Sequence, residues 1–221
     1  MKLRASMGMA AACALMLLTA NALAQDDSAE KKGMKGHADE MGKMAQEMDP
    51  EMKAWMEAAT PGPNHKLLDY SVGTWDTLVR TWDQKTGETQ ESTGKSTSKW
   101  VLDGHYVKTK YTGEFMGMPF EGIGICGYDN IKKTFVSTWM DSMSTGIVTE
   151  QGSYDPASKT FTFKSEFPDP SGKTIKSKST IKIIDNNKHV LTMYHSEPGK
   201  DELVKGLEIT YTRADKSTQP E

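Results

Sequence analysis

The feature that most constrains this sequence is a series of turn signals that recur at regular intervals between Gly73 and Arg213. Between the turns, apolar and polar residues alternate with a period of two, which is typical of β-strands. Consecutive hairpins produce this spacing, whereas parallel strands would need helical crossovers, and no helical pattern lies between the turns. The signals lie at Thr86-Gly87, Asp103-Gly104, Met116-Gly117, Asp129-Asn130, Ser142-Met143, Asp155-Pro156, Asp169-Pro170-Ser171-Gly172, Asp185-Asn186-Asn187 and Pro198-Gly199.

Nine turns predict ten antiparallel strands in one small domain. An open meander of this length would expose unpaired strand edges, and closing the sheet into a barrel removes them. We therefore predict an all-β domain, an up-and-down antiparallel barrel of about ten strands over residues 61–213. A sandwich of two sheets is the alternative.

The first 24 residues have the composition of a secretory signal peptide. Lys2 and Arg4 precede an apolar run over residues 7–20, and Ala22-Leu23-Ala24 forms an A-x-A cleavage site. The run is shorter than the roughly 20 apolar residues that cross a bilayer, so no membrane span is predicted. We expect cleavage after Ala24 and a periplasmic or secreted protein.

Charge and cysteine content narrow the possible partners. Lys and Arg number 27 against 30 Asp and Glu, for a net charge of −3, so no global basic field attracts nucleic acid. Cys13 is lost with the signal peptide, which leaves Cys126 as the single cysteine of the mature chain. No intramolecular disulfide can then form, and stability must come from the core.

Between the signal peptide and the barrel lies a segment rich in Lys, Glu, Asp and Met. We expect residues 25–48 to be disordered and residues 49–60 to form an amphipathic helix, capped by Asp49 with Pro50 in its first turn. Its Met and Trp face should pack on the barrel domain. The alternative is soft-metal capture by Met34, His37, Met41, Met44 and Met48. Residues 214–221 are predicted to be a disordered tail.

The alternation also indicates which side chains face the lumen, because one face of each strand carries Lys and Glu and the other does not. The predicted inner wall mixes aromatic residues with many Ser and Gly, where a packed core would use Leu, Val and Ile. Small polar linings favour a cavity that holds water or a ligand. The candidate ligand-lining residues are Trp100, Tyr111, Gly122, Gly124, Trp139, Asp141, Ser165, Ser177, Met193 and His195.

Two of these residues could do more than line a cavity. Asp141 could orient a polar group of a ligand, or it could cap the turn that follows it through its own hydrogen bonds. His195 follows Leu191 and Met193 on one strand face and is expected near a barrel mouth. There it could bind haem iron or simply be a hydrogen-bonded or exposed histidine at the end of a strand.

The two ends of the barrel region resemble the calycin superfamily of lipocalins and fatty-acid-binding proteins. Gly73-Thr74-Trp75-Asp76 opens the first strand, and Tyr211-Thr212-Arg213 closes the last. The resemblance implies that the Trp75 indole packs under the Arg213 guanidinium and seals one end of the barrel. Such a contact is favourable by about 0.5–2 kcal/mol. Gly73, Trp75 and Arg213 are accordingly expected to be structural residues.

Longer motifs resemble a bacterial family of secreted, calycin-like proteins catalogued only as a domain of unknown function. The resemblance extends from Asp49 to Arg213 and implies a fold, but no activity. Its motifs are PNHKLL at 63–68, MGMPFEG at 116–122 and STWMDSMSTG at 137–146.

No catalytic motif is present: the sequence lacks a nucleophile elbow, an HExxH helix, a dinucleotide fingerprint and a phosphate loop. We therefore expect a protein that is not an enzyme and that binds a small apolar or amphipathic ligand in its lumen, with no cofactor. The alternatives are a haem- or metal-binding barrel and a structural or interaction module with a filled core. An enzyme using Asp141 and His195 would require these side chains to converge.

Overall fold

The computed structural model describes residues 49–84 and 86–214. The expected signal peptide 1–24, the linker 25–48 with its possible metal ligands, and the tail from residue 215 onwards lie outside these residues. The chain divides into two compact units, Met1–Trp55 and Met56–Glu221, and the barrel belongs to the second.

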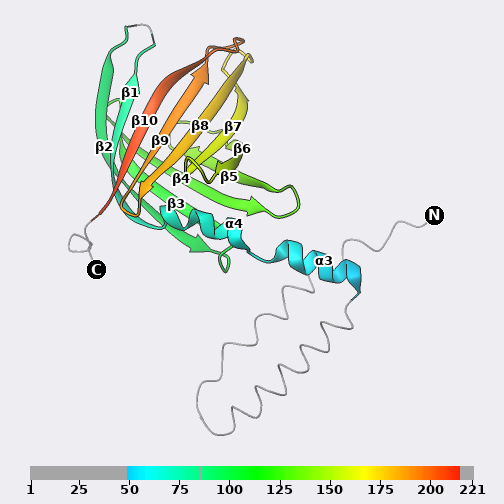
Figure 1. The fold of residues 1–221 in the computed structure, drawn as a ribbon. Helices are drawn as coiled ribbons and strands as arrows, with labels where there is room; N and C mark the ends of the chain where they lie inside the picture. Colours follow the sequence, from blue (N-terminus) through cyan, green and yellow to red (C-terminus); the bar gives the residue numbers. More distant parts are fainter. Residues whose placement is uncertain (1–48, 85, 215–221) are drawn as a thin grey trace. The chain divides into compact units, whose positions relative to one another are not determined.

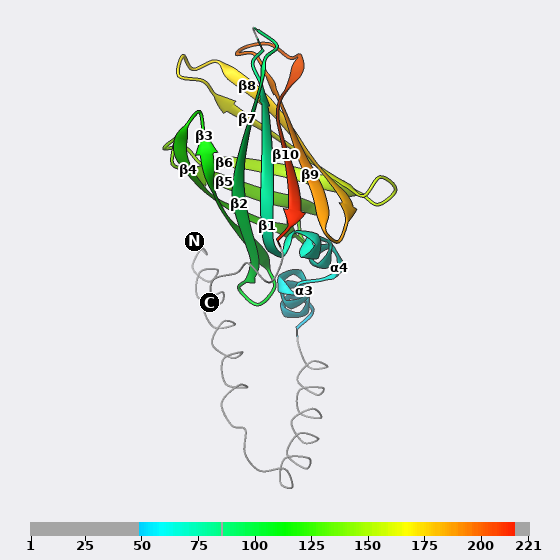
Figure 2. The same ribbon diagram turned by 90° about the vertical axis from the view of Figure 1, so that its left-hand side faces the viewer.

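Ten strands form one closed, entirely antiparallel barrel in which each strand pairs with its neighbours in the sequence and β1 also pairs with β10 (Figures 1 and 2). The predicted up-and-down barrel is confirmed, and the sandwich alternative is wrong because the sheet closes on itself. The strands are β1 Gly73–Trp82, β2 Thr89–Val101, β3 Tyr106–Phe115, β4 Met118–Asp129, β5 Thr134–Asp141, β6 Val148–Asp155, β7 Thr160–Pro168, β8 Thr174–Asp185, β9 Lys188–Ser196 and β10 Leu203–Arg213.

Aspartates at the ends of strands set several of the turns. In each case a carboxylate oxygen accepts a hydrogen bond from the backbone N–H two residues later, which is the geometry of an Asx turn. The turns form where these residues were predicted to break the strands. The aspartates are Asp129, Asp141, Asp155, Asp169 and Asp185.

The strand register defines the inner face. Phe161 is fully buried and Phe163 is almost so, and their register partners on β8 and β9 share their face. The register pairs continue this face onto every strand of the barrel. It is the face that the alternation of Lys and Glu predicted to be the inner one. Four serines on this face are buried: Ser96, Ser98, Ser177 and Ser179.

A short plug fills one end of the barrel. The α-helix α4, Pro63–Lys66, leads into the 3-10 helix η1, Leu67–Ser71, which carries the buried Leu68 (Figure 2). Leu68 packs in a cluster with Val107, Phe135, Phe161 and Phe163. The hydrophobic core therefore lies at the end of the barrel where β1 begins.

A longer helix precedes the plug. The helix α3, Pro50–Ala59, begins as predicted, with the Glu51 N–H donating to Asp49 Oδ1 at 2.9 Å. No residue of α3 is buried, and Trp55 and Met56 are 60% and 49% exposed. The boundary between the two units falls within this helix, so the packing of its Met and Trp face on the barrel stays a prediction.

Side chains from two turns of the barrel bind the carbonyl groups at the end of α3. Asn130 Nδ2 donates to the carbonyl oxygens of Ala58 and Thr60, and His105 Nε2 lies 2.8 Å from that of Ala59. The last carbonyls of a helix have no partner within it, so such contacts satisfy them. Within the described residues, no helix is long and apolar enough to cross a membrane.

Candidate functional site

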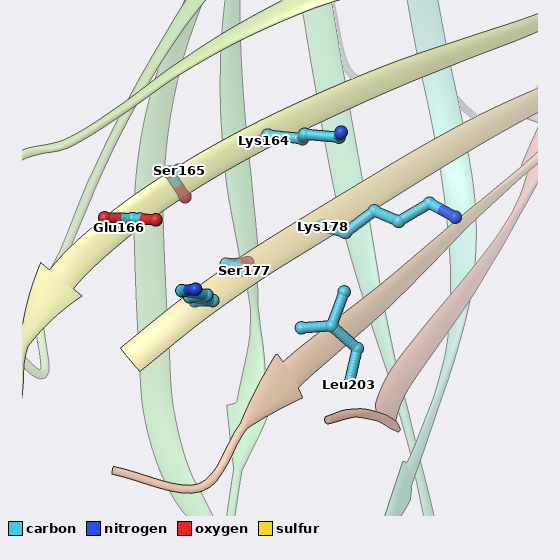
Figure 3. A pocket seen from close by; sticks show the side chains of 7 residues that line it. Lys164, Ser165, Glu166, Ser177, Lys178 and Leu203 are labelled. Carbon is cyan, nitrogen blue, oxygen red and sulfur yellow. The ribbon is translucent and has the colours of Figure 1, made fainter. Parts of the chain in front are cut away.

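Three polar side chains form a row across the inner wall. Register pairs place Ser165 of β7 beside Ser177 of β8, and Ser177 beside His195 of β9. The two serine hydroxyls and the His195 Nδ1 are buried and have no hydrogen-bond partner within residues 49–84 and 86–214. On the other side of the sheet, a pocket of about 380 Å³ is lined mainly by outer-face residues, and the two serines lie behind them; these outer residues are Lys164, Glu166, Lys176, Lys178 and Leu203 (Figure 3).

The lysines beside this row belong to the opposite face of the sheet. Figure 3 shows Ser165 and Ser177 on neighbouring strands, while Lys164 and Lys178, which pair in register, extend in a common direction. Lys178 lies over the Tyr194 ring, and Lys176 forms an ion pair with Asp201. Among the described residues, Thr77 Oγ1 and His189 Nδ1 are also buried without a partner, but the three atoms of the row lie side by side. Burying such a group without a hydrogen bond costs about 1–3 kcal/mol.

Glu150 of β6 adds a carboxyl group to the inner wall. It pairs in register with Ser137, which in turn pairs with Cys126. The Ser179 hydroxyl donates to Glu150 Oε1 at 3.2 Å. Burial raises the pKa of Glu150, although the hydrogen bond from Ser179 opposes the rise. Burial, and then the nearby Glu150, raise the pKa of Cys126 to about 12, so this thiol stays protonated.

Sequence reasoning missed Glu150. On β6 the outer face carries no Lys or Glu and the inner face carries Glu150, so the contrast that identified the inner face on other strands is reversed. A weak signal was present, because Val148, Gly152 and Tyr154 occupy alternate positions with Glu150. An inward glutamate between them could have been proposed from that pattern.

His195 lies on the inner wall beside Ser177, and burial lowers its pKa. Its ring meets that of Phe167 edge to face at a centroid separation of 6.2 Å. In the described part of the chain, no group of three or more His, Cys, Asp or Glu residues could hold a metal ion.

Asp141 is engaged within its own hairpin. Its Oδ2 accepts the indole N–H of Trp139 at 2.9 Å, and its Oδ1 accepts the Met143 N–H of the following turn at 2.9 Å. Of the two roles considered for this residue, the turn-capping one is observed. Both bonds hold Asp141 to its own hairpin, so the geometry offers no support for an acid–base pair with His195.

The glycines of the inner wall make room for aromatic rings. A Cβ atom on Gly122 would overlap the six-membered ring of Trp139, and one on Gly124 would lie 3.2 Å from it. These positions were expected to leave space in the lumen, but Trp139 occupies that space. Gly152 makes room for Phe163 in the same way, and Gly94 and Gly113 do so for Tyr111.

The other candidate lining residues differ in their surroundings. Trp100 packs against the core cluster, and its indole N–H donates to Asp69 Oδ1 at 2.8 Å, so it belongs to the plugged end. Tyr111 is buried and meets Phe120 edge to face. Met193 is half-buried on the inner wall, between Ser179 and Leu207 in the register.

The plugged end is sealed by Trp75, which is 1% exposed. Arg213 Cζ lies 4.1 Å from the centre of the Trp75 ring, and the guanidinium also donates to the carbonyls of Val72 and Asn186. Gly73 has φ 129°, and any side chain there would meet the Arg213 guanidinium. This position therefore requires glycine both for its backbone and for the space above it.

His189 is a second inner-wall histidine that the sequence reasoning did not single out. Its ring stacks on Tyr211 at 4.3 Å and meets Trp75 edge to face at 4.5 Å. Burial, and then the positive charge of Arg213, lower its pKa to about 4. It is therefore neutral at physiological pH.

The family model described as Protein of unknown function (DUF1579) matches residues 60–213, which include the plug and the whole barrel. The chain belongs to the DUF1579 family. The family expected from the sequence motifs, a domain of unknown function, is thus shown. No curated protein matches this DUF1579 chain significantly.

Solved structures share the fold of this DUF1579 protein at low sequence identity. The crystal structure of Rv2717c from M. tuberculosis has a TM-score of 0.51 and 13% identity, and the match covers 71% of this chain and 100% of that one. The S-type phycobiliprotein lyase CPES from Guillardia theta has a TM-score of 0.49 and 11% identity, with 69% and 93% coverage. The likeness to Rv2717c, at 13% identity, extends to the fold alone.

Proposed function

We propose that this DUF1579 protein binds a small amphipathic ligand in the lumen of its barrel. The observation that carries the proposal is the row formed by Ser165, Ser177 and His195, whose buried polar atoms have no hydrogen-bond partner among the residues that the structure describes. Buried polar groups in folded proteins are almost always hydrogen-bonded. A ligand with a polar group at this row would satisfy them.

The rest of the inner wall suits the apolar part of such a ligand. Leu191, Met193, Leu207 and Ile209 lie on the inner faces of β9 and β10 and are only partly buried. Small-molecule sites in proteins are concave and mostly apolar. Apolar walls with a few converging polar groups are the usual composition of these sites.

The direct test is native mass spectrometry of the protein purified from the compartment in which it is made. We expect a complex with one small molecule that is released on denaturation. The variant Ser177→Leu, which places a large apolar side chain in the row, should lose the molecule. Ser153→Leu, at an exposed position on the outer face of β6, is the matched control and should retain it.

A barrel that carries no molecule and binds none from a panel of fluorescent apolar probes would overturn the proposal. Circular dichroism of both variants, measured beside the unchanged protein, shows whether each retains its fold. Loss of the molecule in Ser153→Leu as well as in Ser177→Leu would contradict binding at the row.

We also propose that binding proceeds without catalysis and without a resident cofactor. The bonds that hold Asp141 within its own hairpin, and the lack of a catalytic motif in the sequence, support this. The purified protein is expected to show no absorption band in the visible range. A visible band that disappears in His195→Ala would instead establish a haem or metal protein.

A further inference from the structure

The inner wall carries carboxyl groups but almost no Lys or Arg side chains. Glu150 and Asp141 face inward, and among the described strand residues the only inward Lys or Arg is Arg213. Arg213 is held at the plugged end by Trp75 and two carbonyl groups. The described part of the wall near Glu150 therefore offers no cation to a buried carboxylate.

Glu150 itself has a single protein hydrogen bond, from Ser179, and forms no ion pair with any described residue. An ionised carboxylate has two oxygens and accepts about four hydrogen bonds, so most of its capacity is unused. Removing such a charge from water is unfavourable unless an opposite charge or further donors compensate.

The polar row lies next to Glu150 on the inner wall. Ser177 is two residues from Ser179 on the same face of β8, and it is only 5% exposed with its hydroxyl unpartnered. Ser165 and His195 flank it. The oxygens of both serines can accept hydrogen bonds, and so can the Nδ1 of a histidine whose proton is on Nε2. This part of the wall can therefore present several acceptors around one carboxylate.

We propose, on the basis of the lumen binding proposed above, that the ligand is an amphipathic amine whose ammonium group pairs with Glu150 and donates to the Ser165–Ser177–His195 row. An ammonium group has three N–H donors and no acceptor, which matches a carboxylate surrounded by acceptors. An anionic head group would meet Glu150 as a like charge and find no cation on this stretch of wall. A neutral alcohol would satisfy one or two of the polar atoms and leave the carboxylate without a counter-ion.

Titratable groups near Glu150 come from several strands. Cys126 of β4 stays protonated, Tyr154 of β6 packs on Phe161 toward the plugged end, and His195 of β9 is kept neutral by burial. Asp141 of β5 is bonded within its hairpin. In the ammonium complex Glu150 is the group that must give up its proton, so affinity for an amine should fall as the pH is lowered.

The test compares three probes with the same alkyl chain: dodecylamine, dodecanol and dodecanoate. Their affinities for the full-length mature protein are measured by tryptophan fluorescence and isothermal titration calorimetry, below the micelle concentration of each probe. At neutral pH we expect dodecylamine to bind about ten-fold more tightly than dodecanol, and dodecanoate to bind more weakly than both.

The variant Glu150→Gln keeps the size of the side chain and removes its charge. It should reduce the affinity for dodecylamine to that for dodecanol and leave the affinity for dodecanol unchanged. Glu121→Gln, on the exposed outer face of β4, is the matched control and should change neither. From neutral pH down toward the pKa of Glu150, which burial raises above its usual range, the affinity for dodecylamine should fall in the unchanged protein. Glu150→Gln should remove this dependence.

Because His195 would also repel an ammonium group once protonated, His195→Gln is measured over the same pH range. The pH dependence should persist in it. Equal affinity for the three probes, a preference for dodecanoate, or an amine preference that survives Glu150→Gln would overturn the amine proposal and leave lumen binding standing. If none of the three probes binds, both proposals fail.

Discussion

At the scale of single residues, the inner wall is organised by pairs of one ring and one glycine on neighbouring strands. Trp139 lies over Gly122 and Gly124, and Phe163 lies over Gly152. In these pairs the glycine is set by the space that the ring needs rather than by a positive φ. The Ser and Gly residues of the wall therefore differ in role. The glycines lie where aromatic rings fill the space, whereas the serines of the row carry polar groups without partners.

The pair formed by Gly122 and Trp139 leads to a stability prediction. Gly122→Ala places a Cβ atom within the Trp139 ring, so the ring must move, and we expect a loss of about 1–3 kcal/mol in unfolding free energy. Urea denaturation followed by tryptophan fluorescence measures it. The double variant Gly122→Ala/Trp139→Leu should lose less than the sum of the single variants. Gly146→Ala, where a Cβ meets nothing within 4 Å, should be close to neutral.

His189 predicts how stability depends on pH. Its pKa is about 4 in the folded protein and about 6.5 when unfolded, so the unfolded state binds more protons between these values. Above about pH 6.5, His189 is neutral in both states and does not reduce the unfolding free energy. As the pH falls toward 4, His189 gains a proton in the unfolded state only, which lowers the unfolding free energy by up to about 3 kcal/mol. Urea unfolding at several pH values should show a shallower acid loss in His189→Phe, which keeps an aromatic ring against Tyr211. Equal slopes in the two proteins would contradict this account.

At the scale of elements, the plug closes one end of the barrel and completes its hydrophobic core. Leu68 of η1 is 2% exposed and completes the cluster of Val107, Phe135, Phe161 and Phe163. Leu68→Ala should lower the unfolding free energy by about 2–5 kcal/mol, because it leaves a cavity at the closed end. Leu102→Ala, at a site 71% exposed in the β2–β3 turn, should change it by less than about 0.5 kcal/mol. Thermal and urea unfolding compare the two variants.

The strands were predictable because their signals are local. Asp and Gly residues end each strand, and outward lysines such as Lys164 and Lys178 reveal the inner face by contrast. The plug contacts were not predictable, because the bond between Asp69 and Trp100 joins residues far apart in the sequence. The same holds for the ring and glycine pairs, which depend on the register between strands. Glu150 was missed because on β6 the Glu lies on the inner face, whereas on the other strands Lys and Glu mark the outer face.

At the scale of the whole molecule, the barrel begins well after the N-terminal segment that we interpret as a signal peptide. If that segment is removed during export, the mature protein should begin at Gln25. N-terminal sequencing and intact mass of protein recovered from the periplasm or the medium measure this. Replacing Ala24 with a bulky residue should block cleavage, and the larger precursor should accumulate. Full-length protein recovered from the cytoplasm alone would contradict the export proposal.

The pairing of β1 with β10 sets the order in which the domain can be completed. The indole of Trp75 lies on the first strand and the guanidinium that covers it on the last, so the seal joins residues at opposite ends of the domain. During synthesis β1 emerges early, and its edge stays unpaired until β10 has left the ribosome. A chain stopped before β10 would leave open edges on both β1 and β9, and such edges recruit other chains. The final residues of the domain thus protect it from self-association as well as closing its wall.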